Sequence, residues 1–563
     1  MKIEYVVSKV RVPNITMEMH LELDDFIEHL TELFKNKSYI KVESKARELT
    51  RLYPMEPQGW KILGACLSAQ GQVSRALAPL RRAINLSPQD AAAHNNLGIA
   101  LKSLSLMNEA KECFKAALRI NPRYATAFNN LGNTNKALGL FSEAELCYSR
   151  AIELKRDFYE AHSNRLMLTA SFAHDHNKYS KYKSQFNDIV QLKTQFEFRH
   201  EANKDLRTIR LGFVSGDLTS HPVGYFLEDF LYELRSYDVL LYGYSTHPNN
   251  TEIGSRLSKL FYNFASISNL SDLDAAELIH SDKIDVLFDL SGHTAKNRLA
   301  VFAYKPARIQ VSWLGYFAST GIAQIDYILG DKFVTPNRDA DYYSEKIIQL
   351  EESYICFSEP KDPPDIKALP VLKNRFITFG CFNNLARMNN NVIEVRAKIL
   401  NQLPNSMLFL KCRHLNFKHE RERVIQLFKS YGVGRERLIF EGYSPRQDYL
   451  ESYNKVDIVL SPFPYGGGTT VCEGLWMGVP AIVKSGEYFL SRIGESIMNN
   501  SGLKEWVALT EEEYIEKAIR FALDENKLAV LRSEMRVRLR ECVLFNPVKF
   551  TSDFMLKIQS ICA

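Results

Sequence analysis

The sequence predicts an α-helical repeat solenoid followed by an α/β region of two lobes. Three observations support this fold class: a 34-residue period early in the chain, strands alternating with helical segments further on, and a proline-rich segment that divides this alternation in two. A chain of 563 residues is too long for one hydrophobic core. We therefore predict a repeat domain at 1–165, a helical joint at 166–206, an N-terminal lobe at 207–370 and a C-terminal lobe at 371–563.

The repeats come first. Leu63-Gly64, Leu97-Gly98 and Leu131-Gly132 are spaced by 34 residues, and alanine, aromatic or leucine, and proline positions recur in the same register. This period, with small residues where helices cross, resembles the tetratricopeptide repeat, in which each helix pair buries one face on the next pair. The predicted repeats are 56–89, 90–123 and 124–157, with a weak leading repeat at about 22–55 and a truncated helix from Phe158.

Paired asparagines recur at one offset in the first helix of two repeats. They are Asn95 with Asn96 and Asn129 with Asn130. Their side-chain amides could bind the backbone of an extended peptide, or they could serve the packing of one helix on another. The sequence leaves both interpretations open.

The α/β region begins near residue 208. In the N-terminal lobe, apolar runs typical of buried strands lie at 209–215, 239–244, 284–290 and 309–314, separated by helical patterns. The segment Ser358–Asp365 holds three prolines and indicates a linker. In the C-terminal lobe, strands are predicted at 376–380, 407–411, 438–440, 458–460 and 481–483. Each lobe should form a parallel sheet wrapped by helices, and we expect a ligand in the cleft between the lobes.

One segment of the C-terminal lobe is typical of an anion site. Pro464–Thr470 holds three consecutive glycines and two threonines, between a predicted strand and a predicted helix. Gly467 and Gly468 would let backbone N–H groups approach a phosphate, and the helix N-terminus adds partial positive charge. Glu473, one turn into the helix, could bind the hydroxyls of a ribose. A glycine-rich turn without a ligand is the alternative.

Three further loops follow predicted strands. His221 and His293 each lie on such a loop, where an imidazole can transfer protons near neutral pH. Arg387 follows the first strand of the C-terminal lobe and could neutralise a departing diphosphate. The segment Glu441–Tyr449 could wall a nucleotide base. The alternatives are ordinary loop histidines and a solvated arginine.

Composition limits the classes of function. The chain has 71 basic and 66 acidic residues, a balance that does not indicate nucleic-acid binding. Its nine cysteines form no CxxC pair and no Cys/His metal spacing, which suggests reduced thiols. The first residues lack the pattern of a signal peptide, and no apolar stretch approaches the length of a membrane span. We therefore expect a cytoplasmic protein.

The repeats and the loop segments that follow the predicted strands together resemble glycosyltransferase family 41, the O-linked N-acetylglucosamine transferases and their bacterial relatives. The resemblance covers about 22–560, and the lack of a long insert between the lobes is similar to the bacterial branch. It implies a GT-B fold with two Rossmann-like lobes. The matching stretches are Leu211–Asp217 with His221-Pro222, Trp313–Tyr316, Asp326–Ile328, Tyr343–Glu345, Phe382–Leu385, Leu403–Ser406, Gly467–Thr470, Leu475–Pro480, Ser491-Arg492 and Leu544–Asn546.

The resemblance also implies roles for single residues. His221 falls on the histidine proposed as general base in this family, and Arg387 falls where a lysine lies near the diphosphate. Gly468 and Tyr449 stand where animal members have histidines. The residues implied to bind the UDP-sugar are His293, Asn384, Ser444, Arg446, Tyr449, Gly467, Gly468, Thr469, Thr470 and Glu473.

The expected activity is inverting transfer of a sugar, N-acetylglucosamine or another hexose, from a UDP-sugar to a protein side chain, foremost serine or threonine. We expect the repeats and the cleft to bind the acceptor protein, and no cofactor or metal to be needed. The triplets Asp272-Leu273-Asp274 and Asp339-Ala340-Asp341 are expected to cap helices or to be solvated. A binding scaffold with an inactive transferase region, a transferase acting on a small acceptor, and a sugar-nucleotide epimerase remain alternatives. A homo-oligomer is also open.

Overall fold

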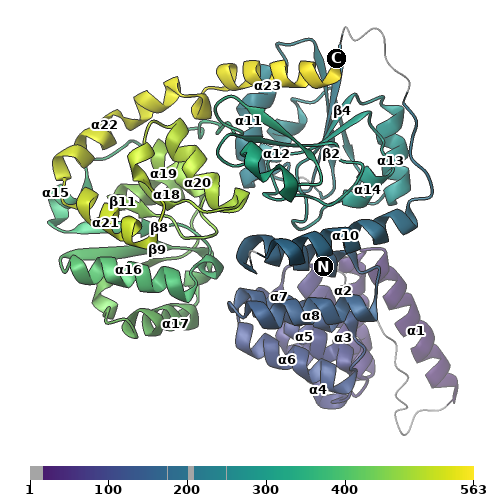
Figure 1. Cartoon of the computed structure of the whole chain (residues 1–563). Helices are drawn as coiled ribbons and strands as arrows, with labels where there is room; N and C mark the ends of the chain where they lie inside the picture. Colours follow the sequence, from purple (N-terminus) through teal and green to yellow (C-terminus); the bar gives the residue numbers. More distant parts are fainter. Residues whose placement is uncertain (1–16, 174, 201–207, 249) are drawn as a thin grey trace. The chain divides into compact units, whose positions relative to one another are not determined.

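The computed structural model describes residues 17–173, 175–200, 208–248 and 250–563 (Figure 1). The first sixteen residues, on which the absence of a signal peptide was judged, lie outside this range, as do residues 201–206 of the predicted joint. The chain divides into two compact units, Met1–Arg165 and Leu166–Ala563. The predicted fold class is confirmed, with helical repeats first and two parallel sheets after them.

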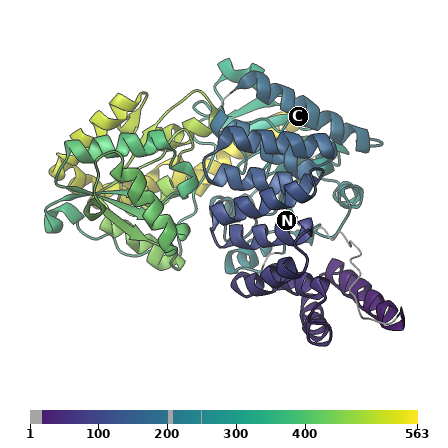
Figure 2. The same ribbon diagram turned by 90° about the horizontal axis from the view of Figure 1, so that it is seen from below.

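The first unit is a stack of helix pairs (Figure 2). The period in the sequence has a steric cause, because a Cβ on Gly64, Gly98 or Gly132 would lie 2.5–2.7 Å from a side chain of the partner helix. Each clear repeat is one helix pair. The helices are α1 (Met17–Lys35), α2 (Tyr39–Leu52), α3 (Pro57–Ala69), α4 (Val73–Leu86), α5 (Ala91–Ser103), α6 (Met107–Ile120), α7 (Ala125–Ala137) and α8 (Phe141–Leu154), followed by α9 (Tyr159–Leu168).

The paired asparagines are buried between these helices. Asn130 Nδ2 donates to Asn95 Oδ1 at 3.0 Å, and Asn164 Nδ2 donates to Asn129 Oδ1 at 2.9 Å. The exposed fractions of Asn95, Asn129 and Asn130 are at most 4%. Helix packing therefore accounts for Asn129, Asn130 and the Oδ1 of Asn95, which bond across neighbouring repeats. Asn95 Nδ2 and Asn96 Oδ1 are buried without a hydrogen-bond partner among the described residues.

The N-terminal lobe is built on a seven-stranded parallel sheet of order β3-β2-β1-β4-β5-β6-β7. Its strands are β1 (Ile209–Ser215), β2 (Val239–Ser245), β3 (Asn263–Ser266), β4 (Val286–Asp289), β5 (Ile309–Ser312), β6 (Tyr327–Asp331) and β7 (Lys346–Leu350). Its helices are α11 (Pro222–Leu234), α12 (Glu252–Ser258), α13 (Asp272–Ser281) and α14 (Leu299–Ala303). Ahead of the lobe, the π-helix η1 (Thr169–Ala173) leads into α10 (His176–Lys193). Strands β1, β2, β4 and β5 were predicted from the sequence, whereas β3, β6 and β7 were not.

The C-terminal lobe has a six-stranded parallel sheet of order β10-β9-β8-β11-β12-β13. The order reverses between β8 and β11, and ligands of such sheets bind outside the carboxyl ends of the strands at this switch point. The strands are β8 (Ile377–Cys381), β9 (Ser406–Lys411), β10 (Leu438–Glu441), β11 (Ile458–Leu460), β12 (Ala481–Lys484) and β13 (Val507–Ala508). The helices are α15 (Pro370–Asn374), α16 (Asn390–Gln402), α17 (Lys418–Lys429), α18 (Arg446–Glu451), α19 (Thr469–Trp476), α20 (Phe489–Asn500), α21 (Glu511–Ala522) and α22 (Glu525–Glu541). The last helix of the chain, α23 (Pro547–Cys562), follows them.

The last helix returns to the first lobe. In Figure 1, α22 and α23 form the yellow ribbon that runs from the C-terminal lobe to the N-terminal lobe. Phe554 on α23 packs against Phe230 on α11 with ring centroids 4.8 Å apart, and Arg308 Nη2 donates to the carbonyl of Cys562 at 2.7 Å. The range predicted for the C-terminal lobe, 371–563, includes this helix, because helical periodicity does not show which sheet a helix covers.

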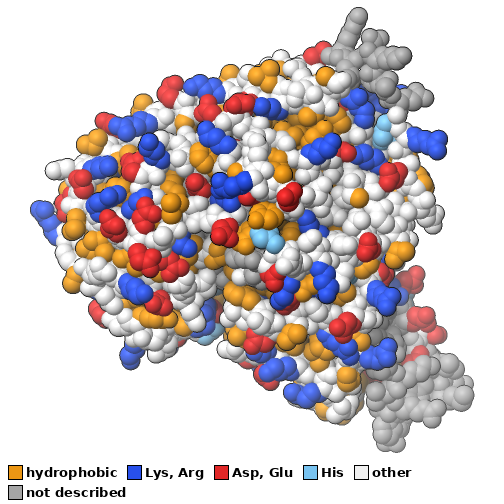
Figure 3. Space-filling model, in the orientation of Figure 1, with side chains coloured by type: hydrophobic (Ala, Val, Ile, Leu, Met, Phe, Trp, Pro, Cys, Tyr) orange, Lys and Arg blue, Asp and Glu red, His pale blue; other side chains and the backbone are white. Residues whose placement is uncertain are grey.

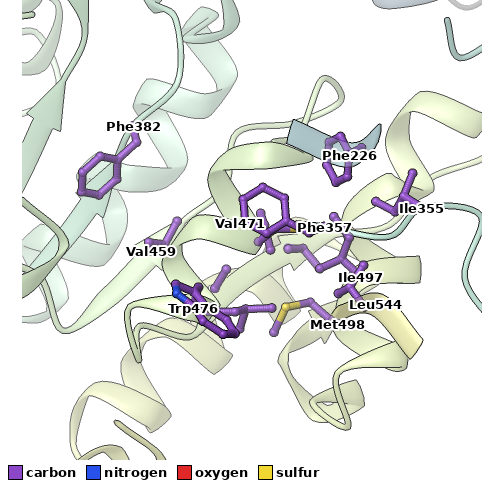
Figure 4. Packing of buried hydrophobic residues seen from close by; sticks show 14 of the residues in the cluster. Phe226, Ile355, Phe357, Phe382, Val459, Val471, Trp476, Ile497, Met498 and Leu544 are labelled. Atoms are coloured by element: carbon purple, nitrogen blue, oxygen red, sulfur yellow. The ribbon is translucent and has the colours of Figure 1, made fainter. Parts of the chain in front are cut away.

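Aromatic packing joins the two lobes (Figure 4). Phe226 on α11 contacts Phe357 at the start of the linker, with ring centroids 5.4 Å apart. Phe357 contacts Phe545 at 5.7 Å, and Phe545 stacks on Trp476 of α19 at 5.5 Å. A continuous core thus runs from α11 to α19, and both helices begin at loops predicted to carry chemistry.

The surface of the described residues carries charges of both signs. Acidic and basic side chains are interspersed on the face drawn in Figure 3, in line with the formal net charge of +5. Among the helices that the structure describes, none is both long enough and apolar enough to cross a bilayer.

Candidate active site

A cavity of about 960 Å³ lies between the two lobes of the second unit. The N-terminal lobe contributes Pro222 and Tyr225 of α11, and the linker contributes Ser358–Asp362. Seven of the predicted site residues line the wall on the side of the C-terminal lobe: Asn384, Ser444, Arg446, Tyr449, Thr469, Thr470 and Glu473. These residues follow β8, β10 and β11, so the cavity lies at the predicted edge of the sheet.

The glycine-rich loop leads from β11 into α19. Gly467 N–H donates to Ser461 Oγ at 3.1 Å, which ties the loop to the end of the strand. Asn383 Nδ2 donates to Thr470 Oγ1 at 3.2 Å and orients that hydroxyl. The N-cap residue of α19 is Gly468, which provides no side-chain cap, and both threonines of the first turn line the cavity. Uncapped N–H groups and the positive end of the helix favour an anion here.

The Glu473 carboxylate is 2% exposed and already has partners. Arg446 pairs with Oε1, while the hydroxyls of Tyr449 and Tyr453 donate to Oε2 at 3.1 and 3.4 Å. The Arg446 guanidinium also lies over the ring of Tyr225 at 4.5 Å. Arg446 therefore connects the lobes across the cavity. Burial raises the pKa of Tyr449 well above its usual value, so its hydroxyl stays a donor.

Ser444 presents an unsatisfied hydroxyl. Its Oγ is buried and has no hydrogen-bond partner among the described residues, although Ser444 lines the cavity. Buried polar atoms without partners are rare in folded proteins, and ligand sites are one place where they occur. The segment predicted to hold a base therefore contains a donor and acceptor that a ligand can engage.

Arg387 is fixed beside the glycine-rich loop. It ends the short helix η3 (Leu385–Arg387), and its Nη1 donates to the carbonyl of Gly466 at 2.7 Å. The guanidinium carbon lies 3.7 Å from the centroid of the Tyr465 ring. The alternative of a solvated arginine is not what the structure shows. Neighbouring Asn384 accepts from Ala386 N–H at 3.0 Å and lines the cavity.

His221 lies at the rim on the opposite lobe. It precedes α11, and its neighbours Ser220 and Pro222 line the cavity. Its Nδ1 accepts from Val223 N–H at 3.4 Å and lies 3.7 Å from Asp217 Oδ2. Burial lowers the pKa of His221 below 6.5, with Asp217 opposing this shift. The imidazole is therefore neutral at pH 7, with Nε2 on the side away from these contacts.

His293 is not brought to the cavity. It is 2% exposed, and its Nε2 hydrogen-bonds to the carbonyl of Thr320 at 2.8 Å. Its ring packs against Phe186 of α10 and against Tyr316. The fold thus places this histidine in the interior of the N-terminal lobe, away from the residues with which it was grouped.

Neither of the two DxD triplets lies free at the cavity. Asp274 belongs to the capping box of α13, and Asp272 pairs with Arg298 at 2.7 Å, as expected for helix-capping residues. Asp339 differs from the expectation, because it is 5% exposed and forms a buried ion pair with Arg492. Within the described residues, no group of three or more His, Cys, Asp or Glu side chains is placed to hold a metal.

Three residues of the site were not predicted from the sequence: Asn383, Tyr225 and Tyr453. Asn383 is adjacent to the chosen Asn384, and only the fold shows which amide reaches Thr470. Tyr453 follows Tyr449 by one helical turn, a spacing that could have indicated it. Nothing in the sequence pointed to Tyr225, since its role depends on the approach of the other lobe.

Comparison with known proteins agrees with this geometry. The family model for glycosyl transferase family 41 matches residues 168–360 and 367–554, and tetratricopeptide models match 67–105, 91–124 and 125–158. A solved structure of a mutant of the Thermobaculum terrenum O-GlcNAc transferase superposes with a TM-score of 0.81 at 30% identity, covering 90% of this chain and 97% of that chain.

Curated relatives are longer proteins. The probable UDP-N-acetylglucosamine–peptide N-acetylglucosaminyltransferase SPINDLY of Petunia hybrida is 31% identical over 370 residues, which are 65% of this chain and 40% of that protein. The UDP-N-acetylglucosamine–peptide N-acetylglucosaminyltransferase of Caenorhabditis elegans is 23% identical over 463 residues, with 61% and 40% covered. The chain spans about two fifths of the length of these relatives.

Proposed function

The chain belongs to glycosyl transferase family 41, and from that premise we propose that it moves a sugar from a UDP-sugar to a polypeptide side chain with inversion at the anomeric carbon. N-acetylglucosamine is the first sugar to test, with other hexoses next, because relatives at 30–31% identity are named for that sugar. Serine or threonine is the proposed acceptor. The observation that carries the proposal is the convergence of the glycine-rich loop, Glu473 and the Ser444–Tyr449 segment on one cavity.

The diphosphate is proposed to bind at the N-terminus of α19. The uncapped N–H groups and the hydroxyls of Thr469 and Thr470 would donate to its oxygens, and the helix end adds about half a positive charge. Arg387, fixed on the Gly466 carbonyl, would balance the charge that gathers on the leaving group. Removing one such donor typically costs about 10²–10³ in turnover. On this proposal, these groups supply the stabilisation for which other transferases use a divalent ion.

The uridine is proposed to lie along α18. Ser444 Oγ offers a hydrogen bond, Tyr449 offers a ring, and Glu473 is aimed at the same space. A ribose that hydrogen-bonds to Glu473 would compete with Arg446 for the carboxylate. Donor binding would therefore loosen the contact of Arg446 with Glu473, while the stacking of Arg446 on Tyr225 holds the guanidinium nearby.

The acceptor would approach from the side of His221. The acceptor oxygen forms a bond to the anomeric carbon, and the bond from that carbon to the diphosphate oxygen breaks with its electron pair on UDP. The acceptor proton passes to the imidazole of His221, which is neutral at pH 7 because burial lowers its pKa. Attack opposite the leaving group inverts the configuration.

The acceptor polypeptide is proposed to bind the repeats as well as the cavity, because stacked repeats form extended surfaces that bind other polypeptides. We also propose a cytoplasmic location, because all nine cysteines are free thiols and free thiols persist in reducing compartments.

Calorimetry with UDP and mass analysis of labelled protein would test the proposal. The full chain is incubated with a panel of UDP-sugars and a lysate of its host, with and without a chelator. We expect UDP binding and a labelled polypeptide under both conditions. Thr470→Val should weaken UDP binding, whereas Thr551→Val removes a buried hydroxyl of α23 without an effect on UDP.

Each alternative has its own outcome. UDP binding without transfer or donor hydrolysis would favour the inactive scaffold. Transfer confined to small acceptors would favour a transferase that does not act on proteins. A strict requirement for a divalent ion would overturn the metal-independent step while leaving the donor site in place.

A further inference from the structure

A second cavity of the second unit has no part in the site described above. It lies where α10, the N-terminal lobe and the start of α20 meet, and it measures about 60 Å³. One buried water needs about 10–15 Å³, so this volume holds the end of one side chain and is too small for a nucleotide. Its wall is mostly aromatic. The rings are His176, Tyr179, Phe317, Tyr342, Tyr343, Tyr488 and Phe489.

The rings are ordered by contacts among themselves. His176 stacks on Tyr342 with ring centroids 3.8 Å apart and lies 4.7 Å from the ring of Tyr488. The Tyr179 hydroxyl donates to the carbonyl of Ser319 at 2.7 Å. Burial lowers the pKa of His176, so its imidazole is neutral at pH 7 and adds no positive charge to the wall.

The charges around the cavity leave one carboxylate uncompensated. Asp339 and Asp175 both line the wall. Asp339 is paired with Arg492, whereas Asp175 accepts only the backbone N–H of Lys178, at 3.0 Å, and has no basic side chain within ion-pair distance among the described residues. Aromatic faces beside a carboxylate attract a cation.

One more cation lies behind the wall. Lys183 Nζ donates to Ser319 Oγ at 3.3 Å and to the carbonyl of Tyr342 at 3.0 Å. Ser319 Oγ in turn donates to Glu345 Oε2 at 2.6 Å, so Glu345 balances this ammonium. Arg338 Nε also lies 3.8 Å from Asp339 Oδ1, and the Glu487 carboxylate acts on the His176 ring. Three cations thus face four carboxylates, and the cavity keeps an excess of one negative charge.

The cavity is close to the glycine-rich loop. Phe317, in its wall, contacts Tyr465 with ring centroids 5.3 Å apart. The other neighbour of Tyr465 is Arg387, whose guanidinium lies 3.7 Å from the ring centroid. Two aromatic rings therefore separate the cavity from the cation assigned to the leaving group, a separation that a few residues of extended chain can span.

We propose that this aromatic cavity binds a lysine side chain of the acceptor polypeptide, a few residues from the side chain that receives the sugar. The inference rests on the proposed function for the identity of its ligand. The ammonium group meets the faces of Tyr342 and Tyr488 and the carboxylate of Asp175. The site thereby selects acceptors that carry a positive charge at one fixed distance from the modified residue.

Peptide binding to the full chain tests this proposal without reference to turnover. Each short labelled peptide carries one central threonine and one lysine. A set of such peptides places the lysine at each of the remaining positions in turn. Each has a partner peptide with norleucine in place of lysine, which keeps the alkyl chain and removes the charge. Fluorescence anisotropy in the presence of UDP gives both dissociation constants. At one position, or two adjacent ones, we expect the lysine peptide to bind about tenfold tighter.

Three variants locate the effect. Asp175→Asn keeps a capping side chain at the start of α10 and should bring the lysine-to-norleucine ratio close to one. Tyr342→Leu should reduce the ratio by removing a ring. Asp188→Asn removes an exposed carboxylate from the same helix and should leave the ratio unchanged.

Two results would overturn the inference: equal binding of lysine and norleucine peptides at every position, or a lysine preference that survives Asp175→Asn. Calorimetry with UDP reports separately on the donor site. Failure of the proposed function would appear as absent UDP binding and transfer, while the peptide ratios still decide whether the cavity takes a cation.

Discussion

Replacing Gly467 by alanine isolates the contribution of one hydroxyl to donor binding. A Cβ at this position would lie 2.0 Å from Thr470 Oγ1 and 2.9 Å from Asn383 Nδ2. The first distance is far below any van der Waals contact, so Thr470 must rotate. Its hydroxyl then leaves the position that Asn383 fixes through a 3.2 Å hydrogen bond.

The size of the effect follows from the bonds that are lost. Losing the bond from Asn383 to Thr470 should lower the free energy of unfolding by about 0.5–1.5 kcal/mol, which leaves the fold intact. A hydrogen bond to a charged diphosphate contributes about 1.5–3 kcal/mol, so UDP affinity should fall by about tenfold to a hundredfold. Calorimetric titration of the full chain with UDP measures this, and thermal unfolding checks the fold.

Gly468→Ala is the matched control. The nearest atom to a Cβ there is Ile493 Cγ2 at 3.6 Å, an ordinary contact, so UDP affinity should stay within about twofold of the wild type. Combining Gly467→Ala with Thr470→Val should add little to either change, because both remove the same hydroxyl. Wild-type affinity in Gly467→Ala, or an equal loss in Gly468→Ala, would refute the steric argument.

Three further outcomes are expected. Arg387→Ala should reduce turnover by about 10²–10³ with an unchanged circular dichroism spectrum; turnover near the wild-type rate would remove Arg387 from the mechanism. The acid limb of kcat/KM should have an apparent pKa below 6.5, because burial lowers the pKa of His221 and only the neutral ring accepts a proton. Asp217→Asn should move this limb to lower pH, since Asp217 favours the charged ring, and an unmoved limb would assign it to another group. Gly98→Ala should lower the free energy of unfolding by about 1–3 kcal/mol, because its Cβ would lie 2.7 Å from the Phe114 ring. A second substitution, Phe114→Leu, should restore part of the lost stability, and no recovery would contradict this steric cause.

The features that the sequence predicted correctly are those whose geometry depends on residues close together in the chain. The repeats were predictable because each Leu-Gly pair meets the same partner position one helix later, as Gly98 meets Phe114. The glycine-rich loop was predictable because strand, glycines and helix follow one another along the chain. In both cases the residues that create the geometry are near one another in sequence.

Long-range contacts decided the rest. His293 and His221 both follow a strand of the same sheet, yet the packing of α10 over His293 takes it into the interior. Asp339 looked like a solvated residue, and Arg492, which neutralises it, lies in the other lobe. A carboxylate or imidazole finds its partner through the fold, so the pattern around it in the chain cannot tell a ligand contact from a buried pair.

The pairing of Arg446 with Glu473 determines how the donor site should be probed. A buried carboxylate without a partner would be costly, and Arg446, Tyr449 and Tyr453 compensate it in this structure. Binding of a ribose then exchanges one set of hydrogen bonds for another, so the net gain is smaller than the contact alone suggests. Substituting Arg446 would remove a competitor of the ribose and, at the same time, leave Glu473 poorly compensated, and these effects have opposite signs. A change in UDP affinity at Arg446 therefore cannot identify its cause, whereas Thr470, which has one neutral partner in Asn383, gives a loss that can be interpreted directly.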